Sequence, residues 1–397
     1  MKTATRAGLG ILAVTALTAS LAACGGGAIG GDSEADDAFK VGLIAPVTGP
    51  VVPEATAMQR GFYLAIEKIN EAGGVLGKPV EVVEVDDQAD AAKSTQLAQR
   101  LINQDEVDYI FGTIPGDTTA AVVQVSEAAG VPFSSAILGN AGICSDYFYP
   151  FGEPNANLLN GLIPYMMEEY GPKVAMVGND YAFPRDYFAD ARKLVEENGG
   201  EVVLEEYSPL GTADWQPIVS KITSAAPDWV LTAAVGSDAI ALMTQADQAG
   251  LVDSMGFTGV SLIADFYPGL GERIEGLSLV GRYSDQIDNP ANAEFVEAFR
   301  AAYDFEDPIP SVAANAYVGM LLIADAVERA GSTDGAAIAE AMQGAGVTDS
   351  VFGAGSFSDD RFFITETQRF EIQAGGAYIP VESFAADIAG LTPRCGA

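Results

Sequence analysis

Small polar side chains follow several predicted strands, and their chemistry is that of ligand binding. They form four groups: Thr48 with Gly49; Thr113 to Thr118, which includes Gly116 and Asp117; Ser134 with Ser135; and Gly236 with Ser237 and Asp238. In doubly wound sheets, ligands bind beyond the carboxyl ends of strands, beside helix N-termini whose free N–H groups favour anions and polar oxygens. The groups therefore predict a site for a small solute. The alternative interpretation is turn and N-cap chemistry, which Ser, Thr, Asp and Gly also supply.

Catalytic chemistry has little support in this sequence. There is no histidine, which excludes His-based triads and imidazole acid–base catalysis. The Gly-rich stretch 73–79 has Ala72 where a P-loop needs its first glycine and Pro79 where it needs Ser or Thr. The acidic stretch 86–90 lacks the turn glycine of an EF-hand, and no nucleophile-elbow motif occurs. We therefore expect a binding protein with no enzyme activity, cofactor or metal.

Alternating strand and helix patterns would position the polar groups. Apolar runs predict strands over 39–45, 79–85, 107–112 and 131–136, with helices between them and over about 117–129. The pattern restarts with strands over 173–180, 201–208 and 228–234, and with helices over 185–198 and from about 214. Three helical patterns over 291–344 follow, and then a hairpin over 350–373 and an irregular tail. This alternation predicts an α/β fold with parallel sheets and helices on both faces.

A weak internal repeat indicates two similar lobes. Residues 67–85 and 193–207 each run from a charged helix end through Gly-Gly into a valine-rich strand. Because the two copies occur in successive units, the sequence predicts two doubly wound parallel-sheet lobes.

The N-terminus carries the pattern of an export signal. Lys2 and Arg6 precede an apolar run over 8–17, and the small residues of Leu-Ala-Ala-Cys end at Cys24. This exit resembles the lipobox of bacterial lipoproteins, in which the cysteine becomes lipidated. The alternative is an ordinary signal peptide with an incidental cysteine. The Gly-rich and acidic residues 25–38 then predict a flexible tether.

The net charge limits which molecules the protein can bind, and the cysteines indicate the compartment in which it works. With 20 basic and 55 acidic residues, the formal charge is −35, so nucleic acid and anionic lipid are excluded as partners. Two interpretations of the acidic surface remain open. It keeps the protein soluble, as in salt adaptation, or it attracts cationic solutes. If Cys24 carries lipid, Cys144 and Cys395 remain as a predicted disulfide in an oxidising compartment. Two separate thiols are the alternative.

Four sequence strings carry a family resemblance: Asn-Asp-Tyr-Ala-Phe-Pro-Arg at 179–185, Glu-Glu-Tyr-Ser-Pro-Leu-Gly at 205–211, and the stretches 70–81 and 295–303. They resemble the type I periplasmic binding proteins of bacterial ABC importers, in the branch serving branched-chain amino acids, urea and short-chain amides. The likeness runs from about residue 39 to 385. It implies two lobes joined by three hinge crossings, a solute between them and delivery to a membrane permease. The expected bounds are 39–153 with 283–351 for lobe 1, and 154–282 with 352–397 for lobe 2.

The resemblance also implies which residues bind the solute. First-lobe contacts fall on Thr113 to Thr118 and on Ser134, Ser135, Ala136 and Leu138; second-lobe contacts fall on Tyr181, Phe183, Ser237, Asp238 and Asp265. The aromatic pair would pack on the apolar part of the solute, and Asp265 or Asp238 would accept a cationic or N–H group. Packing at the hinge is the alternative role for the aromatics. The chain departs from the family pattern at several of these positions. Amide binders have an aromatic residue and a serine where this chain has Ile114 and Gly116, and a tyrosine and a threonine where it has Ser134 and Ala136. Amino-acid binders have a threonine near Leu138.

The leading interpretation is thus a monomeric, lipid-anchored solute-binding protein on the outer face of the cytoplasmic membrane. It would capture an amino acid, amide or urea and pass it to an ABC permease. The alternative is a sensory subunit that signals solute binding to a receptor.

Overall fold

The computed structural model describes residues 38–139 and 142–385. The predicted signal peptide, the predicted lipidation site Cys24, nearly all of the tether and Cys395 lie outside these residues. Cys144 is disulfide-bonded, but its predicted partner Cys395 is outside the described part, so the Cys144–Cys395 pairing stays a prediction.

The first sheet is parallel and has the strand order β2-β1-β3-β4. Its strands are β1 (Phe39–Ile44), β2 (Val80–Val85), β3 (Tyr109–Gly112) and β4 (Phe133–Ser134), and its helices are α1 (Val52–Glu71), α2 (Ala91–Asn103) and α3 (Gly116–Ala129). The predicted strand over 131–136 is shorter than expected, since β4 has two residues. After α1 the chain turns at Gly74, where φ is +81° and a Cβ would lie 1.8 Å from the carbonyl oxygen of Lys78, so only glycine fits.

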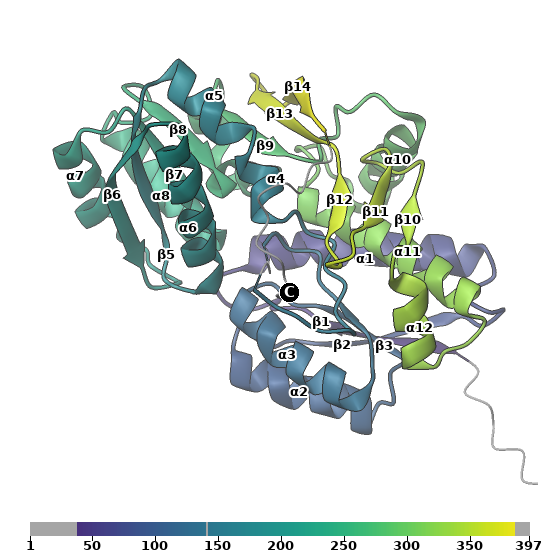
Figure 1. Cartoon of the computed structure of the whole chain (residues 1–397). Helices are drawn as coiled ribbons and strands as arrows, with labels where there is room; N and C mark the ends of the chain where they lie inside the picture. Colours follow the sequence, from purple (N-terminus) through teal and green to yellow (C-terminus); the bar gives the residue numbers. More distant parts are fainter. Residues whose placement is uncertain (1–37, 140–141, 386–397) are drawn as a thin grey trace, which may run out of the picture. The chain divides into compact units, whose positions relative to one another are not determined.

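The second sheet repeats this arrangement with the order β6-β5-β7-β8, also parallel. Its strands are β5 (Lys173–Asn179), β6 (Glu201–Ser208), β7 (Trp229–Ala233) and β8 (Gly256–Gly259). Its helices are α4 (Asn155–Leu159), α5 (Leu162–Glu169), α6 (Ala182–Glu197), α7 (Gln216–Ala225), α8 (Gly236–Gln248) and α9 (Tyr267–Leu270). Short 3₁₀ turns are η1 (Val260–Leu262), η2 (Ala264–Phe266) and η3 (Gly271–Ile274). The equal strand order confirms the predicted α/β fold with two doubly wound units (Figure 1).

The C-terminal third contributes to both units. It contains α10 (Pro290–Tyr303), α11 (Ser311–Ala330) and α12 (Gly335–Met342), as the three helical patterns predict. This part also forms two small antiparallel sheets. One consists of β10 (Gly346–Val347), β11 (Gly355–Phe357) and β12 (Phe363–Thr365), and the other of β9 (Ser278–Gly281), which precedes the helices, with β13 (Thr367–Ile372) and β14 (Tyr378–Phe384). The expectation of an irregular tail after residue 373 is wrong, because residues 378–384 pair with β13 as a strand.

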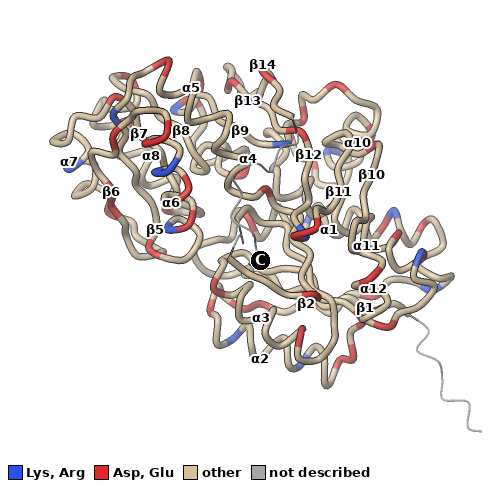
Figure 2. Tube along the Cα trace, viewed as in Figure 1, with Lys and Arg blue, Asp and Glu red and all other residues tan. Residues whose placement is uncertain are grey.

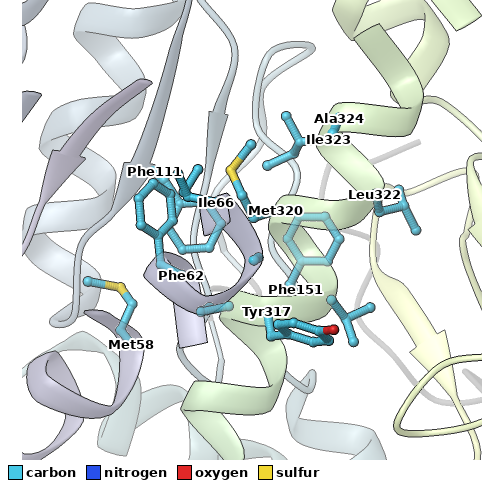
Figure 3. Close-up of a cluster of buried hydrophobic side chains, with 14 of the residues drawn as sticks. Met58, Phe62, Ile66, Phe111, Phe151, Tyr317, Met320, Leu322, Ile323 and Ala324 are labelled. Carbon is cyan, nitrogen blue, oxygen red and sulfur yellow. The ribbon is translucent and has the colours of Figure 1, made fainter. Parts of the chain in front are cut away.

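The core of the first unit is built where α1 packs along α11 (Figure 3). Phe62 of α1 stacks near Phe111 of β3, with ring centroids 5.2 Å apart. Gly61 allows the closest approach, since a Cβ there would lie 1.9 Å from the carbonyl oxygen of Ala313. Among the described residues, α11 is long and apolar enough to cross a membrane, but 83% of its most apolar window is buried. It is therefore placed as the central helix of this core.

The chain passes between the two cores at three places. Phe151 belongs to the first core and Leu158 to the second, while Val280 belongs to the second and Tyr283 to the first. The third passage lies after Phe363, which packs in the first core. We therefore propose a third lobe boundary between β12 and β13, rather than the expected one at residues 351 and 352. The apolar pattern of 352–363 does not reveal which core it joins.

Candidate functional site

A small enclosed cavity of about 20 Å³ lies where strands of both sheets end. Its lining comes from α1 and from the loops that follow β3, β4, β5, β7 and β8: Glu54, Ile114, Gly116, Ile137, Leu138, Tyr181, Phe183, Val235, Val260, Ile263 and Phe266. This is the edge at which doubly wound sheets bind ligands. The lining is apolar and aromatic, with one carboxyl group.

The predicted contact positions that line this cavity are Ile114, Gly116, Leu138, Tyr181 and Phe183. Tyr181 precedes the first turn of α6 and Phe183 lies within it; their ring centroids are 6.3 Å apart. Burial raises the pKa of the Tyr181 hydroxyl, and the nearby carboxylates of Glu54, Asp117 and Asp238 raise it further. Gly116 begins α3, which has no side-chain cap. The first backbone N–H groups of α3 are therefore suited to polar oxygens of a ligand.

The predicted hydroxyl groups of the first lobe bind neighbouring protein groups instead of lining the cavity. Thr113 and Thr119 share a hydrogen bond of 2.8 Å, Thr118 donates to the carbonyl of Pro115 at 2.7 Å, and Ser134 pairs with the Tyr109 hydroxyl at 2.7 Å. Each of these hydroxyl groups thus has a hydrogen-bond partner within the protein.

The remaining predicted positions also lie outside the cavity lining. Thr48 is exposed and donates to Asp86 at 2.6 Å, while buried Ser135 accepts a long bond of 3.4 Å from the N–H of Ile137. Ala136 uses its carbonyl oxygen to accept from Asn315 at 3.0 Å. The side chains of Asp117 and Ser237 are exposed to solvent.

Asp238 is buried and fully engaged with its own lobe. One carboxylate oxygen accepts from the Asn179 side chain at 2.6 Å and from the N–H groups of Gly211 and Thr212 at 2.9 Å each. The other accepts from the Ser237 hydroxyl at 3.3 Å. Asp238 therefore fixes the loop after β6 to the start of α8.

Asp265, in η2, is 5% exposed and keeps one carboxylate oxygen without a partner among the described residues. The other oxygen accepts a weak bond of 3.4 Å from Ser311. Burial raises the pKa of Asp265 to about 7, and the charge of Glu153 adds to the rise. Its neighbours Ile263 and Phe266 line the cavity.

Glu54 is a site residue that the sequence reasoning missed. It is 1% exposed, one oxygen accepts from the N–H of Gly236 at 2.9 Å, and the other has no partner among the described residues. Burial raises the pKa of Glu54 to about 8, and the charges of Asp265 and Asp238 add to this against opposing backbone hydrogen bonds. The only sequence signal is an acid in the first turn of an amphipathic helix, where acids are common on the surface.

The arrangement is suited to binding a cation or a strong N–H donor within an apolar enclosure. Two buried carboxyl groups with free oxygens lie beside it, and a cation would lower their pKa values and restore their charge. No group of three or more acidic, His or Cys side chains that could hold a metal occurs within the described ranges.

Comparison with known sequences places the chain among solute-binding proteins. A family model described as periplasmic binding protein matches residues 38–377. The leucine-, isoleucine-, valine-, threonine-, and alanine-binding protein of Pseudomonas aeruginosa is 28% identical over 322 residues, which cover 78% of this chain and 83% of that protein. Leu/Ile/Val-binding protein homolog 7 of Brucella suis is 26% identical over 332 residues, with coverages of 79% and 83%.

Solved structures agree in fold. A solute binding protein of an ABC transporter from Rhodopseudomonas palustris, in complex with 3,4-dihydroxy benzoic acid, is 25% identical with a TM-score of 0.83, covering 90% of this chain and 100% of that one. A branched-chain amino acid transporter substrate binding protein from Streptococcus pneumoniae, in complex with isoleucine, is 24% identical with a TM-score of 0.77 and coverages of 88% and 99%.

These relatives are binding proteins and not enzymes, as the missing catalytic motifs predict. The family works outside the cytoplasm, binds small solutes and operates with ABC permeases. By its sequence from residue 38 to 377, its two parallel sheets and its closed apolar cavity at their strand ends, the chain belongs to the periplasmic binding protein family, type I.

Proposed function

We propose that this protein captures a small solute with an apolar body and a protonated amine, and delivers it to the permease of an ABC importer. The observation that carries the proposal is the pair of buried carboxyl groups, Glu54 and Asp265, each with an oxygen free of partners among the described residues, beside an apolar and aromatic cavity. An ammonium group supplies the charge and the N–H donors that both carboxylates need.

The relatives include binders of amino acids and of aromatic acids, and the two buried carboxyl groups of this chain favour the amine. The Pseudomonas aeruginosa relative is named for apolar and small amino acids, and the Rhodopseudomonas palustris protein was solved with a dihydroxybenzoate. A ligand whose only charge is a carboxylate would meet two like charges or two buried neutral acids here. An amide or urea, the other solute class predicted from the sequence, offers neutral N–H donors to the same oxygens and is the second candidate.

Solute binding requires the cavity to expand. A volume of about 20 Å³ accommodates about one water molecule. Type I binding proteins consist of two lobes, and hinge motion between lobes is the ordinary way to open such a site. Glu54 of α1 and Gly236 of α8 form one hydrogen bond that opening would break, at 2.9 Å.

The anchor and the partner are part of the proposal. Lipid on Cys24 would hold a monomer at the outer face of the membrane, near its permease. A sensory subunit would use the same cleft, so the two functions differ only in the partner. Genes for a permease and an ATPase beside this one would support import; a gene for a membrane receptor instead would support sensing.

The test measures solute binding by the mature chain with isothermal titration calorimetry and thermal shift. The panel contains leucine, isoleucine, 3-methylbutylamine, acetamide, urea and benzoate. We expect the amines to bind, and Glu54→Gln to weaken them about tenfold or more, as for the loss of a charged hydrogen bond. Glu71→Gln, at the exposed end of the same helix, is the matched control. Preferential binding of benzoate, or unchanged amine affinity in Glu54→Gln, would overturn the proposal.

A further inference from the structure

Arg282 is a buried cation at the passage between the two cores. Its side chain is 1% exposed, and Nε lies 3.4 Å from Oε1 of Glu153, which is itself 2% exposed. Glu153 lies in the first segment that passes between the two cores, and Arg282 lies in the second such segment. The guanidinium carbon lies 5.3 Å from the ring centroid of Phe352 and 5.6 Å from that of Phe363, ahead of the third passage.

The guanidinium group lacks acceptors. An arginine side chain carries five N–H donors, yet Nη1 and Nη2 have no hydrogen-bond acceptor among the described residues. The oxygens of Glu153 are also shared, because Oε1 accepts from the backbone N–H of Arg282 at 3.2 Å and Oε2 from Asn315 at 3.2 Å. The two phenyl rings offset part of the cost of burial. The N–H groups at Nη1 and Nη2 stay buried without an acceptor, which costs free energy unless a ligand supplies one.

A second cavity of about 20 Å³ lies against Arg282. It shares Leu138 and Ile263 with the cavity beside Glu54, so the two spaces are neighbours. Tyr283 also lines it, and the Tyr283 hydroxyl has no partner among the described residues. Glu153 lines the cavity as well, and its oxygens accept from Arg282 and Asn315. The lining residues with polar atoms that lack a partner among the described residues are Arg282 and Tyr283, which offer N–H groups and a hydroxyl.

We propose that this cavity is an inner subsite in which Arg282 holds an anionic group of the solute. The inference rests on the proposed function and extends it, because the amine would lie near Glu54 and Asp265 and the anion at the hinge. The anion is a carboxylate, since its planar pair of oxygens matches the guanidinium fork. Glu153, which lines the subsite, and nearby Asp265 would repel a doubly charged phosphate more strongly than a singly charged carboxylate.

The test compares two probes that differ by a carboxylate, L-leucine and 3-methylbutylamine, by titration calorimetry on the mature chain. We expect wild type to prefer leucine by about tenfold or more, the usual value of a charge-assisted bond. Arg282→Gln should bring the affinity ratio close to one while amine binding persists. Arg282→Lys keeps the charge and protects folding, and it should retain part of the preference. Arg300→Gln, which removes an ion pair with Asp285 outside both cavities, is the control.

The affinity ratio separates binding from structure, since a purely structural arginine would weaken both probes equally. An unchanged preference in both folded Arg282 variants would overturn the inference and assign the carboxylate to the start of α3. Equal affinities in wild type would also overturn it, leaving a cavity for water only. If neither probe binds but acetamide or urea does, this inference and the amine assignment are both wrong, and solute binding stands with the second candidate. If no panel solute binds, the proposed function fails as well.

Discussion

At the residue scale, the site depends on which carboxyl groups are satisfied by the protein itself. Asp238 has four hydrogen-bond donors of its own lobe around it, whereas Glu54 and Asp265 each keep a free oxygen. All three are buried, so burial alone does not identify a ligand-binding acid. The unpaired oxygen does, because a buried polar atom without a partner costs free energy that a ligand can recover.

Asp238 should therefore matter for stability more than for binding. Asp238→Ala removes acceptors of Asn179, Gly211 and Thr212, and we expect the free energy of unfolding to fall by about 2 to 4 kcal/mol. Urea denaturation measures this change, and calorimetry on the folded variant should give a solute affinity within about threefold of wild type, near the limit of an indirect effect. A large loss of affinity with unchanged stability would mean that Asp238 contacts the solute.

The raised pKa values of Glu54 and Asp265 predict a pH dependence of stability. Folding raises these pKa values from 4.5 to about 8 and from 3.8 to about 7, so the folded state holds these protons more tightly than the unfolded state. The resulting stabilisation is complete below about pH 4 and is lost as pH rises toward 8. We expect ligand-free wild type to lose on the order of a few kcal/mol over this window, and Glu54→Gln to lose less.

Denaturation at several pH values between 4 and 8 measures this loss. Amine affinity should change in the opposite direction, strengthening as the carboxyl groups lose their protons, with proton release visible in buffers of different ionisation enthalpy. Equal pH slopes for wild type and Glu54→Gln would contradict the assignment.

At the element scale, the site exists because loops from five strands end beside one helix. The lining residues follow β3, β4, β5, β7 and β8, and α1 adds Glu54. The position of α1 is set by its packing against α11, where Gly61 meets the backbone of Ala313. A small residue at this crossing thus helps to place a ligand-binding acid two turns away along the helix.

Gly61→Ala should disturb this crossing. The added methyl group would collide with backbone, which cannot move aside as a side chain can, and we expect about 1 to 3 kcal/mol of destabilisation. Thermal and urea unfolding measure it, with Glu71→Ala on the exposed end of α1 as the control. Because α1 must shift, amine affinity should fall as well. A stability equal to that of wild type would show that the helices are less tightly packed than described.

At the scale of the whole molecule, binding and anchoring are separate properties. Asp and Glu outnumber Lys and Arg on the elements of both sheets (Figure 2), which favours the approach of a cationic group and disfavours nucleic acid. The cavity and its acids lie entirely within residues 54–266. Nothing in that site requires the N-terminal segment.

Cys24→Ser should therefore release a competent protein. Without the thiol for lipid attachment, we expect the chain to move from the membrane fraction to the soluble fraction, with solute affinity unchanged. Fractionation followed by calorimetry on the released protein measures both. The Cys144→Ser variant, which retains the lipid site, should stay with the membrane and is the control. Retention of Cys24→Ser at the membrane would contradict lipid anchoring.

The sequence by itself predicts the fold class, which the structure confirms, because apolar periodicity and glycine stops are local properties of the chain. It also predicts contact positions of which Ile114, Gly116, Leu138, Tyr181 and Phe183 line the cavity. It does not separate the hydroxyls of Thr118 and Ser134, which bind their own lobe, from groups free to bind a solute. Only the tertiary structure decides that.

Tertiary structure also selects Glu54 and Arg282, which look like ordinary surface charges in the sequence. Their roles depend on burial and on which partners the two lobes leave unfilled, and both arise from contacts between segments more than a hundred residues apart. A local sequence pattern does not indicate such contacts. Local sequence patterns therefore specify the scaffold, and contacts between distant segments specify the buried charges that we propose as the solute-binding groups.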